Sequence, residues 1–264
     1  MKARGESTSL KRSSGSEKPA SQSGVFQIGG DLPIYRLGFG AMRITGPGIW
    51  GEPRDHDEAI RVLRRAVELG INFIDTADSY GPEVSERLIA EALHPYPDGL
   101  VIATKAGFVR NGPNQWTING RPEHLRAACE GSLSRLRVDR IDLYQLHRID
   151  PRVPPEDQLG VLKDLQDQGK IRHVGLSEVT VSQIVHAREI VPIVSVQNRY
   201  SLADRTYEDV LDYCDREHIG FIPWNPINAG NLGSLGVEVD RAAKRHGVTS
   251  AQLALAWLGG VRQS

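Results

Sequence analysis

Four side chains of the kinds that move protons stand at or just after the ends of short apolar stretches. Asp75, Lys105 and His147 each close such a stretch, and Tyr80 follows five residues after Asp75. An ionised group at the end of a core strand needs a partner, so Asp75 and Lys105 are expected to form an ion pair. A nearby ammonium would lower the pKa of the Tyr80 phenol, ordinarily about 10, and make it a usable proton donor near neutral pH. His147 can donate a hydrogen bond to a carbonyl oxygen or assist the proton transfer.

Each of these residues also has a plainer interpretation. Asp75 and Lys105 can form a purely structural salt bridge, and a single histidine on a core strand is more often a satisfied core residue than a functional one. The chemical interpretation therefore depends on whether the chain brings all four side chains to one face.

The elements that would position them alternate regularly between strand and helix. Their starts are about 30 residues apart, which is the length of a β-α unit. Strands are predicted at residues 37–40, 73–75, 101–105, 142–147, 173–176, 193–197 and 220–224. Helices are predicted at residues 57–69, 82–93, 122–136, 155–168, 180–190, 203–217 and 251–258. A hairpin is predicted over residues 25–28 and 32–34, outside this repetition.

This repetition predicts a parallel sheet with helices outside it. A doubly wound dinucleotide-binding sheet would need a Gly-x-Gly-x-x-Gly turn after its first strand, whereas Gly38 and Gly40 are followed by Ala-Met-Arg-Ile. A (β/α)8 TIM barrel is therefore favoured, and in such a barrel reactive groups lie at the carboxyl ends of the strands.

Five short motifs share this order and spacing. They are FIDTADSYG at 73–81, IATK at 102–105, DLYQLH at 142–147, VGLS at 174–177 and SVQN at 195–198. Together they make residues 37–258 resemble the aldo-keto reductase superfamily, in particular bacterial-type members that reduce small aldehydes and ketones.

The resemblance implies an α/β barrel of the aldo-keto reductase type that binds NADP, with NAD also possible, and needs no metal. It implies a catalytic tetrad of Asp75, Tyr80, Lys105 and His147. Tyr80 would be the general acid that protonates the developing alkoxide, and Lys105, held by Asp75, would depress the pKa of Tyr80. His147 would orient the carbonyl group.

The resemblance also implies which residues bind the cofactor. They are Ala41, Met42, Asp75, Ser177, Gln197, Trp224, Asn225, Pro226, Ile227, Gly230, Asn231 and Leu232. Ser177 and Gln197 would hold the carboxamide, and Trp224 would stack on the nicotinamide ring, although it can equally be a core residue. The chain departs from the family at Glu178, where an asparagine is usual, because an ionised glutamate cannot donate a hydrogen bond.

Aromatic residues in the loops after the first and third strands are candidates for the substrate site. With the residues at the end of the fourth strand, the candidates are Trp50, Phe108, Trp116, His147 and Arg148. Binding sites often use aromatic side chains. The same rings can instead anchor the loops on the barrel rim, and Arg148 can be a solvated charge.

Composition excludes several other classes of protein. The net charge is −1, which argues against a nucleic-acid partner, and no apolar run is long enough to span a membrane. The two cysteines, Cys129 and Cys214, form neither a disulfide framework nor a zinc site, which favours the reducing cytoplasm. The composition leaves the oligomeric state open.

The two ends of the chain differ from the rest. Residues 1–24 are rich in serine and carry a net charge of +3, so we expect a disordered tail before a barrel domain at 25–264. At the other end, the repetition predicts an eighth strand near residues 263–268. We therefore expect a barrel that lacks its last β-α unit.

This expectation leaves a second hypothesis, a catalytically impaired or non-catalytic scaffold that binds a partner, as in the reductase-like β subunits of potassium channels. A barrel glycosidase using Asp75 and Glu178 as its two carboxylates would leave Lys105 and Tyr80 without a role.

Overall fold

The computed structural model describes residues 18–228 and 236–260. Its main sheet comprises β3 (Phe39–Gly40), β4 (Phe73–Asp75), β5 (Val101–Ala106), β8 (Ile141–Leu146), β9 (Ile171–Ser177), β10 (Ile193–Gln197) and β11 (Gly220–Phe221). These seven strands are parallel and lie in the order β11-β10-β9-β8-β5-β4-β3. The seven expected strands and their parallel arrangement are confirmed.

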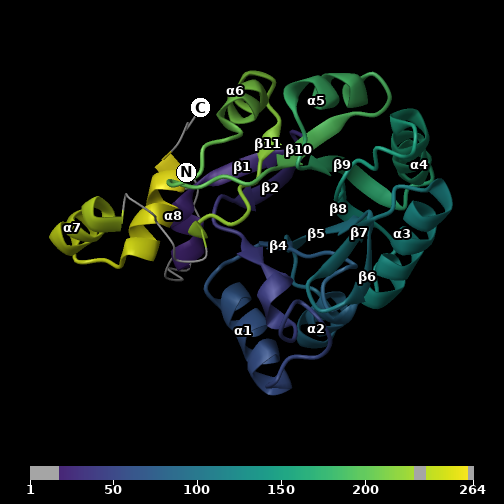
Figure 1. Cartoon of the computed structure of the whole chain (residues 1–264). Coiled ribbons are helices and arrows are strands. Elements are labelled where there is room, and N and C mark those ends of the chain that lie inside the picture. The colour runs from purple at the N-terminus through teal and green to yellow at the C-terminus, as the bar shows by residue number, and fades with distance from the viewer. Residues whose placement is uncertain (1–17, 229–235, 261–264) are drawn as a thin grey trace, which may run out of the picture.

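Helices surround the curled sheet (Figure 1). They are α1 (His56–Glu68), α2 (Val84–Leu93), α3 (Pro122–Leu136), α4 (Pro155–Asp167), α5 (Val181–Arg188), α6 (Glu208–Arg216), α7 (Gly236–His246) and α8 (Ser250–Gly260). The first six follow the strands around the outside, and α7 and α8 lie between α6 and α1 in this view (Figure 1). None of the helices in the described ranges is long and apolar enough to cross a membrane.

Local sequence signals fix where several helices begin. The side chain of Asp55 accepts a hydrogen bond from the backbone N–H of Glu58 (2.8 Å) and caps α1. Thr180 and Gln183 form a reciprocal capping box at α5. Proline occupies the first turn of α3 and α4. The capping side chains accept hydrogen bonds from backbone N–H groups that have no partner within the helix, and proline has no such N–H group. Each helix therefore begins at a defined residue.

A hairpin of β1 (Val25–Ile28) and β2 (Leu32–Tyr35) covers the inner face of the sheet at the amino ends of its strands. Its apolar side chains pack with residues near the starts of β4, β5 and β8: Ile28, Leu32, Ile34, Phe73, Val101 and Leu143. At the hairpin turn, the Asp31 carboxylate binds Arg172 (2.7 Å) and His173 (2.6 Å) on β9. Since one end of the sheet is closed in this way, the candidate site lies at the other.

The structure differs from the sequence-based prediction in several elements. Residues assigned to a loop after β5 form an antiparallel hairpin of β6 (Phe108–Gly112) and β7 (Gln115–Ile118). Helix α7 was not predicted. The helix predicted from residue 203 begins at Glu208, and the strand predicted to reach residue 224 ends at Phe221. The hairpin is hidden in the sequence because its strands are short and its turn is rich in glycine, proline and asparagine, which is typical of a loop.

The amino-terminal boundary also differs. Residues 1–17 of the predicted tail lie outside the described residues, but Pro19–Ser23 form a 3-10 helix that packs on the barrel. Ala20 is buried, and its N–H donates to the carbonyl of Leu69 (2.9 Å). The packed part of the chain therefore includes residues that composition alone assigned to the tail.

Close packing around Gly175 of β9 makes stability sensitive to a small substitution at this residue. A Cβ on Gly175 of β9 would lie 2.3 Å from Oγ of Ser195 and 2.9 Å from Cγ of Gln145, both fully buried. We expect Gly175→Ala to lower the free energy of unfolding by about 2 kcal/mol, because overpacking forces neighbouring side chains out of place. Chemical denaturation measures this.

Gly160→Ala in α4 is the matched control, since a Cβ there meets no atom within 4 Å. It should leave stability unchanged or raise it, because alanine is favoured over glycine inside helices. Equal stability of Gly175→Ala and wild type would contradict the packing described for β9.

Candidate active site

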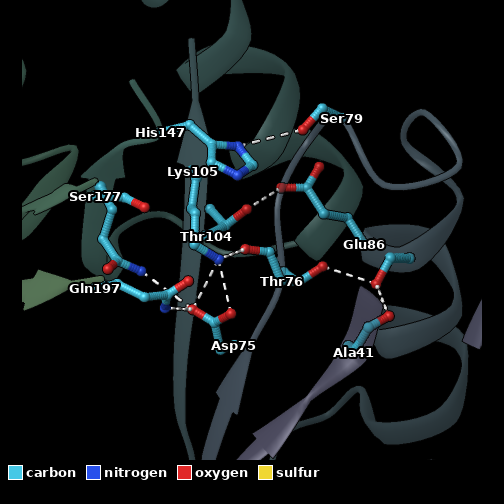
Figure 2. A network of polar contacts seen from close by, with 12 residues as sticks. Ala41, Asp75, Thr76, Ser79, Glu86, Thr104, Lys105, His147, Ser177 and Gln197 are labelled. Atoms are coloured by element: carbon cyan, nitrogen blue, oxygen red, sulfur yellow. Dashed lines mark hydrogen bonds and ion pairs between the residues drawn. The ribbon is translucent and has the colours of Figure 1, made fainter. Parts of the chain in front are cut away.

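The ion pair between Asp75 and Lys105 lies at the carboxyl end of the sheet, where Figure 2 shows it among polar side chains from neighbouring strands. Lys105 Nζ donates to both carboxylate oxygens of Asp75 (2.8 and 2.7 Å) and to the carbonyl of Thr76 (2.8 Å). Lys105 is 0% exposed, and the Asp75 side chain is 16% exposed. Three acceptors thus surround a fully buried ammonium group.

These partners decide the charge of Lys105. Burial alone would lower the pKa of this amine, but the Asp75 carboxylate and the Tyr80 oxygen favour the charged form and raise the pKa above its ordinary value. Lys105 is therefore a fixed positive charge, as the predicted ion pair requires.

Tyr80 lies on the loop between β4 and α2, with its ring close to that charge. Lys105 Nζ is 5.3 Å from the centre of the Tyr80 ring, and Tyr80 is only 6% exposed. Burial raises the pKa of the Tyr80 phenol above its ordinary value, and the opposing effect of Lys105 does not cancel it. The expectation that Lys105 brings the pKa of Tyr80 below its ordinary value is therefore wrong for this structure, because desolvation of a buried phenolate outweighs the attraction of the nearby Lys105 ammonium.

His147 follows β8 directly and faces the same region. The backbone N–H of His147 donates to the carbonyl of Ala106 (2.8 Å), and its ring Nδ1 lies 3.4 Å from Oγ of Ser79. The His147 ring is 5.8 Å from the Tyr80 ring, centre to centre. Burial, with the charges of Lys105 and Arg148, holds the pKa of His147 well below its ordinary value, so the imidazole is neutral at physiological pH.

Two glutamines complete the surroundings of Asp75. Gln145 Nε2 on β8 and Gln197 Nε2 on β10 both donate to Asp75 Oδ1 (3.2 and 2.8 Å). Gln145 was not among the predicted site residues. Its signal in the sequence is a polar residue inside an apolar strand, two positions before His147 and hence on the same face.

The predicted cofactor residues lie in several settings. Ala41 is fully buried, and its carbonyl accepts from Ser85 (3.1 Å), whereas Met42 is half-buried against the group that contains Tyr80. Trp224, Asn225, Pro226 and Ile227 are half-buried in the segment after β11. Gly230, Asn231 and Leu232 lie outside the described residues.

The side chains at the ends of β9 and β10 keep hydrogen-bonding groups of the kinds that a carboxamide requires. Ser177 Oγ accepts from Arg148 Nη1 (3.1 Å), and its hydrogen can still be donated. Gln197 uses its Nε2 on Asp75 and keeps its carbonyl oxygen as an acceptor for an amide. Trp224 supplies a flat aromatic surface nearby. A carboxamide needs both a donor and an acceptor, and this set provides them.

Aromatic rings gather beside Tyr80 and His147. Phe108 on β6 lies 4.7 Å from the His147 ring, and Trp116 on β7 lies 6.4 Å from the rings of both Tyr80 and His147. All of these contacts are close to perpendicular. Of the other predicted substrate residues, Arg148 lies over Phe108 (5.4 Å), while Trp50 contacts Arg110 (5.8 Å).

Arg110 holds this aromatic group together, and sequence reasoning missed it. Its guanidinium donates to five carbonyl oxygens, those of Gly48, Ile49, Ser79, Gly112 and Gln115, at 2.7–3.3 Å. The same guanidinium lies 3.6 Å from the centre of the Trp116 ring. It joins the loop after β3, the Tyr80 loop and the β6–β7 hairpin. A lone arginine in a loop-like segment carries no sequence signal for such a role.

Comparison with known proteins identifies the family. Residues 36–261 match the model of the aldo/keto reductase family. The chain belongs to this family. It is 51% identical over 248 residues to an uncharacterized oxidoreductase of Schizosaccharomyces pombe, covering 94% of this chain and 80% of the relative. The resemblance inferred from the five motifs is confirmed, and the family places the chain among NAD(P)H-dependent oxidoreductases.

Solved structures of the aldo/keto reductase family confirm the barrel fold. A glycerol dehydrogenase from Gluconobacter oxydans superposes with a TM-score of 0.81 at 28% identity, over 90% of this chain and 83% of that one. An aldo-keto reductase from Klebsiella pneumoniae, solved in complex with NADPH, gives a TM-score of 0.73 at 26% identity, over 89% and 80% of the two chains.

In this aldo/keto reductase, we expect Arg110→Met to lower the free energy of unfolding by about 3 kcal/mol, because five carbonyl groups each lose a hydrogen bond from the guanidinium. It should also raise KM for aldehydes, since Trp116 loses its support. Denaturation and steady-state kinetics measure the two effects.

Arg61→Met on α1 is the control, since Arg61 is exposed and pairs with the surface carboxylates of Glu58 and Asp55. It should change neither quantity appreciably. An Arg110→Met variant as stable as Arg61→Met would refute the role assigned to the buried guanidinium.

Proposed function

We propose that this chain reduces aldehydes or ketones to alcohols with a nicotinamide cofactor, using Tyr80 as the general acid. The observation that carries the proposal is the convergence of Tyr80, neutral His147 and the Lys105–Asp75 pair on one end of the sheet. The bound nicotinamide supplies the hydride that reduces the carbonyl carbon. The protein supplies the proton, the orientation and the charge.

The protonation states suit the reductive direction. A buried phenol with a raised pKa stays protonated at neutral pH, so Tyr80 is ready to donate its proton to the alkoxide oxygen as negative charge develops there. The Lys105 ammonium then stabilises the phenolate that remains, and Asp75 keeps Lys105 in place. Burial thus keeps the proton on Tyr80 in the resting site. Lys105 favours transfer of that proton to the substrate oxygen once negative charge develops there.

His147 acts in this proposal as a neutral hydrogen-bond donor. We assign Ser79 Oγ, 3.4 Å from Nδ1, as the donor to that nitrogen, so that the neutral ring carries its hydrogen on Nε2 and can give it to the carbonyl oxygen. The carbonyl is thereby polarised and held within reach of Tyr80. Phe108 and Trp116 form an apolar surface beside it, which suits aldehydes with apolar or aromatic substituents.

For the cofactor, we propose Ser177 and Gln197 as carboxamide partners and Trp224 as the stacking surface. NADPH is the first cofactor to test, since the Klebsiella relative binds it, and NADH is the second. We also propose a cytoplasmic location. Cys129 and Cys214 are both unpaired, and burial raises the pKa of each thiol to about 12, which is typical of inert cysteines in a reducing compartment.

Removal of the phenolic hydroxyl tests the general acid. We expect Tyr80→Phe to lower kcat for NADPH-dependent aldehyde reduction by about 10²–10⁴-fold, the usual value of a positioned proton donor, while the dissociation constant for NADPH stays unchanged. Tyr35→Phe, on the hairpin at the opposite end of the barrel, should keep the wild-type kcat. Full activity of Tyr80→Phe would exclude the proposed acid.

The pH dependence follows from the same protonation states. Because the pKa of Tyr80 is raised, kcat for reduction should stay level through neutral pH and fall only above the ordinary phenol value of about 10. Alcohol oxidation, which needs the phenolate, should instead rise with pH. Because the pKa of His147 is lowered, neither profile should change near pH 6.5 through that residue. A step between pH 6 and 7 that disappears in His147→Gln would show that a charged histidine takes part.

A further inference from the structure

We infer that Glu178 is a positioning residue that fixes the indole of Trp224 as a platform for the nicotinamide ring. This inference rests on the proposed function, in which Trp224 stacks on the cofactor. It gives a role to the position at which the chain departs from the usual asparagine of its family.

The contact between the two side chains is short and directional. The indole Nε1–H of Trp224 donates to Glu178 Oε1 at 2.6 Å. The backbone of Trp224 is held separately, because its N–H donates to Asn198 (3.1 Å) and its carbonyl accepts from Tyr200 (3.3 Å). With the backbone fixed, the remaining freedom of Trp224 is rotation of its side chain. The bond to Glu178 removes that freedom.

Glu178 is itself held from several directions. Its Oε1 also accepts from the backbone N–H of Arg199 (2.7 Å), and its Oε2 accepts from the hydroxyl of Tyr207 (3.2 Å). Its own N–H donates to the carbonyl of Gln197 (3.1 Å), and its backbone has a φ of +56°, in the left-handed region. A non-glycine residue in that region is held there by its surroundings.

A side chain of this length that ends in acceptor oxygens suits this position better than the shorter asparagine. Three donors meet at its two oxygens, whereas an asparagine has one acceptor oxygen and a shorter reach. The charge has a second effect, because the Glu178 carboxylate favours the charged form of Arg148, the neighbour of His147. Because a carboxylate has no hydrogen to donate, Glu178 cannot donate to the cofactor carboxamide as an asparagine would. Its contribution to cofactor binding therefore passes through Trp224.

A double-mutant cycle tests this path. We would measure NADPH affinity by calorimetry, and kcat and KM for an aromatic aldehyde, in wild type, Glu178→Ala, Trp224→Phe and the double variant. Glu178→Ala should weaken NADPH binding about tenfold and lower kcat several-fold without raising KM for the aldehyde. Trp224→Phe has no indole donor, so adding Glu178→Ala to it should change NADPH affinity by less than about twofold.

Glu178→Gln is the conservative variant. It keeps an acceptor oxygen for the indole and should stay close to wild type in affinity. Rescue by glutamine together with loss by alanine separates a hydrogen-bonding role from one of charge. Thermal denaturation of every variant checks that the fold is intact. If Glu178→Ala weakens binding equally in the wild-type and Trp224→Phe backgrounds, Glu178 acts through another contact and the inference is overturned.

A measurement without cofactor separates this inference from the proposed function. The chain has four tryptophans, so the indole N–H signal of Trp224 can be assigned in a ¹H–¹⁵N spectrum by its loss in Trp224→Phe. Glu178→Ala should move that signal upfield and speed its exchange with solvent. An unmoved signal overturns the contact. If the signal moves but wild type binds neither NADPH nor NADH, the proposed function fails, and with it the platform role of Trp224.

Discussion

The burial of one ammonium group organises the carboxyl end of this barrel. Lys105 has no exposed surface, and a charge in that position is tolerable only if anionic or dipolar groups surround it. Asp75 and the carbonyl of Thr76 supply them, and two glutamines from β8 and β10 then bind the same carboxylate. Four strands are thus tied to one charge. The positions of Tyr80 and His147 follow from it, because each is carried by a strand end or loop adjoining this network.

Burial also shifts the pKa values of the neighbouring Tyr80 and His147, in opposite directions. It raises the pKa of Tyr80 and lowers the pKa of His147, so both side chains are neutral and both can donate a hydrogen bond. The permanent charge of Lys105 beside them is held in place by Asp75. A site of this kind stabilises negative charge on a substrate oxygen through fixed dipoles and a fixed cation, without first having to reorganise water.

Much of this arrangement was predictable from the sequence. The parallel sheet and the end residues Asp75, Lys105 and His147 follow from strand spacing and from the rule that parallel strands meet at one edge. The direction of the Tyr80 pKa shift was not predictable, because it depends on how deeply the ring is buried. The roles of Arg110 and Glu178 were not predictable from the sequence, for another reason. Both act through contacts between segments distant in the chain, and Arg110 binds carbonyl groups that every residue carries. The β6–β7 hairpin was hidden by its turn-rich composition.

The Arg110 contacts have a consequence for the response of the site to salt. Several ion pairs in the described part of the chain join exposed side chains, such as Arg61 with Glu58, and dissolved ions screen them. Arg110 instead binds uncharged carbonyl groups from a buried position, where counterions have little access. The three loops that it joins therefore depend little on ionic strength. Concentrated electrolyte should therefore weaken the ion pairs on the outer surface and leave the contacts of Arg110 with the aromatic rings around Tyr80 unchanged.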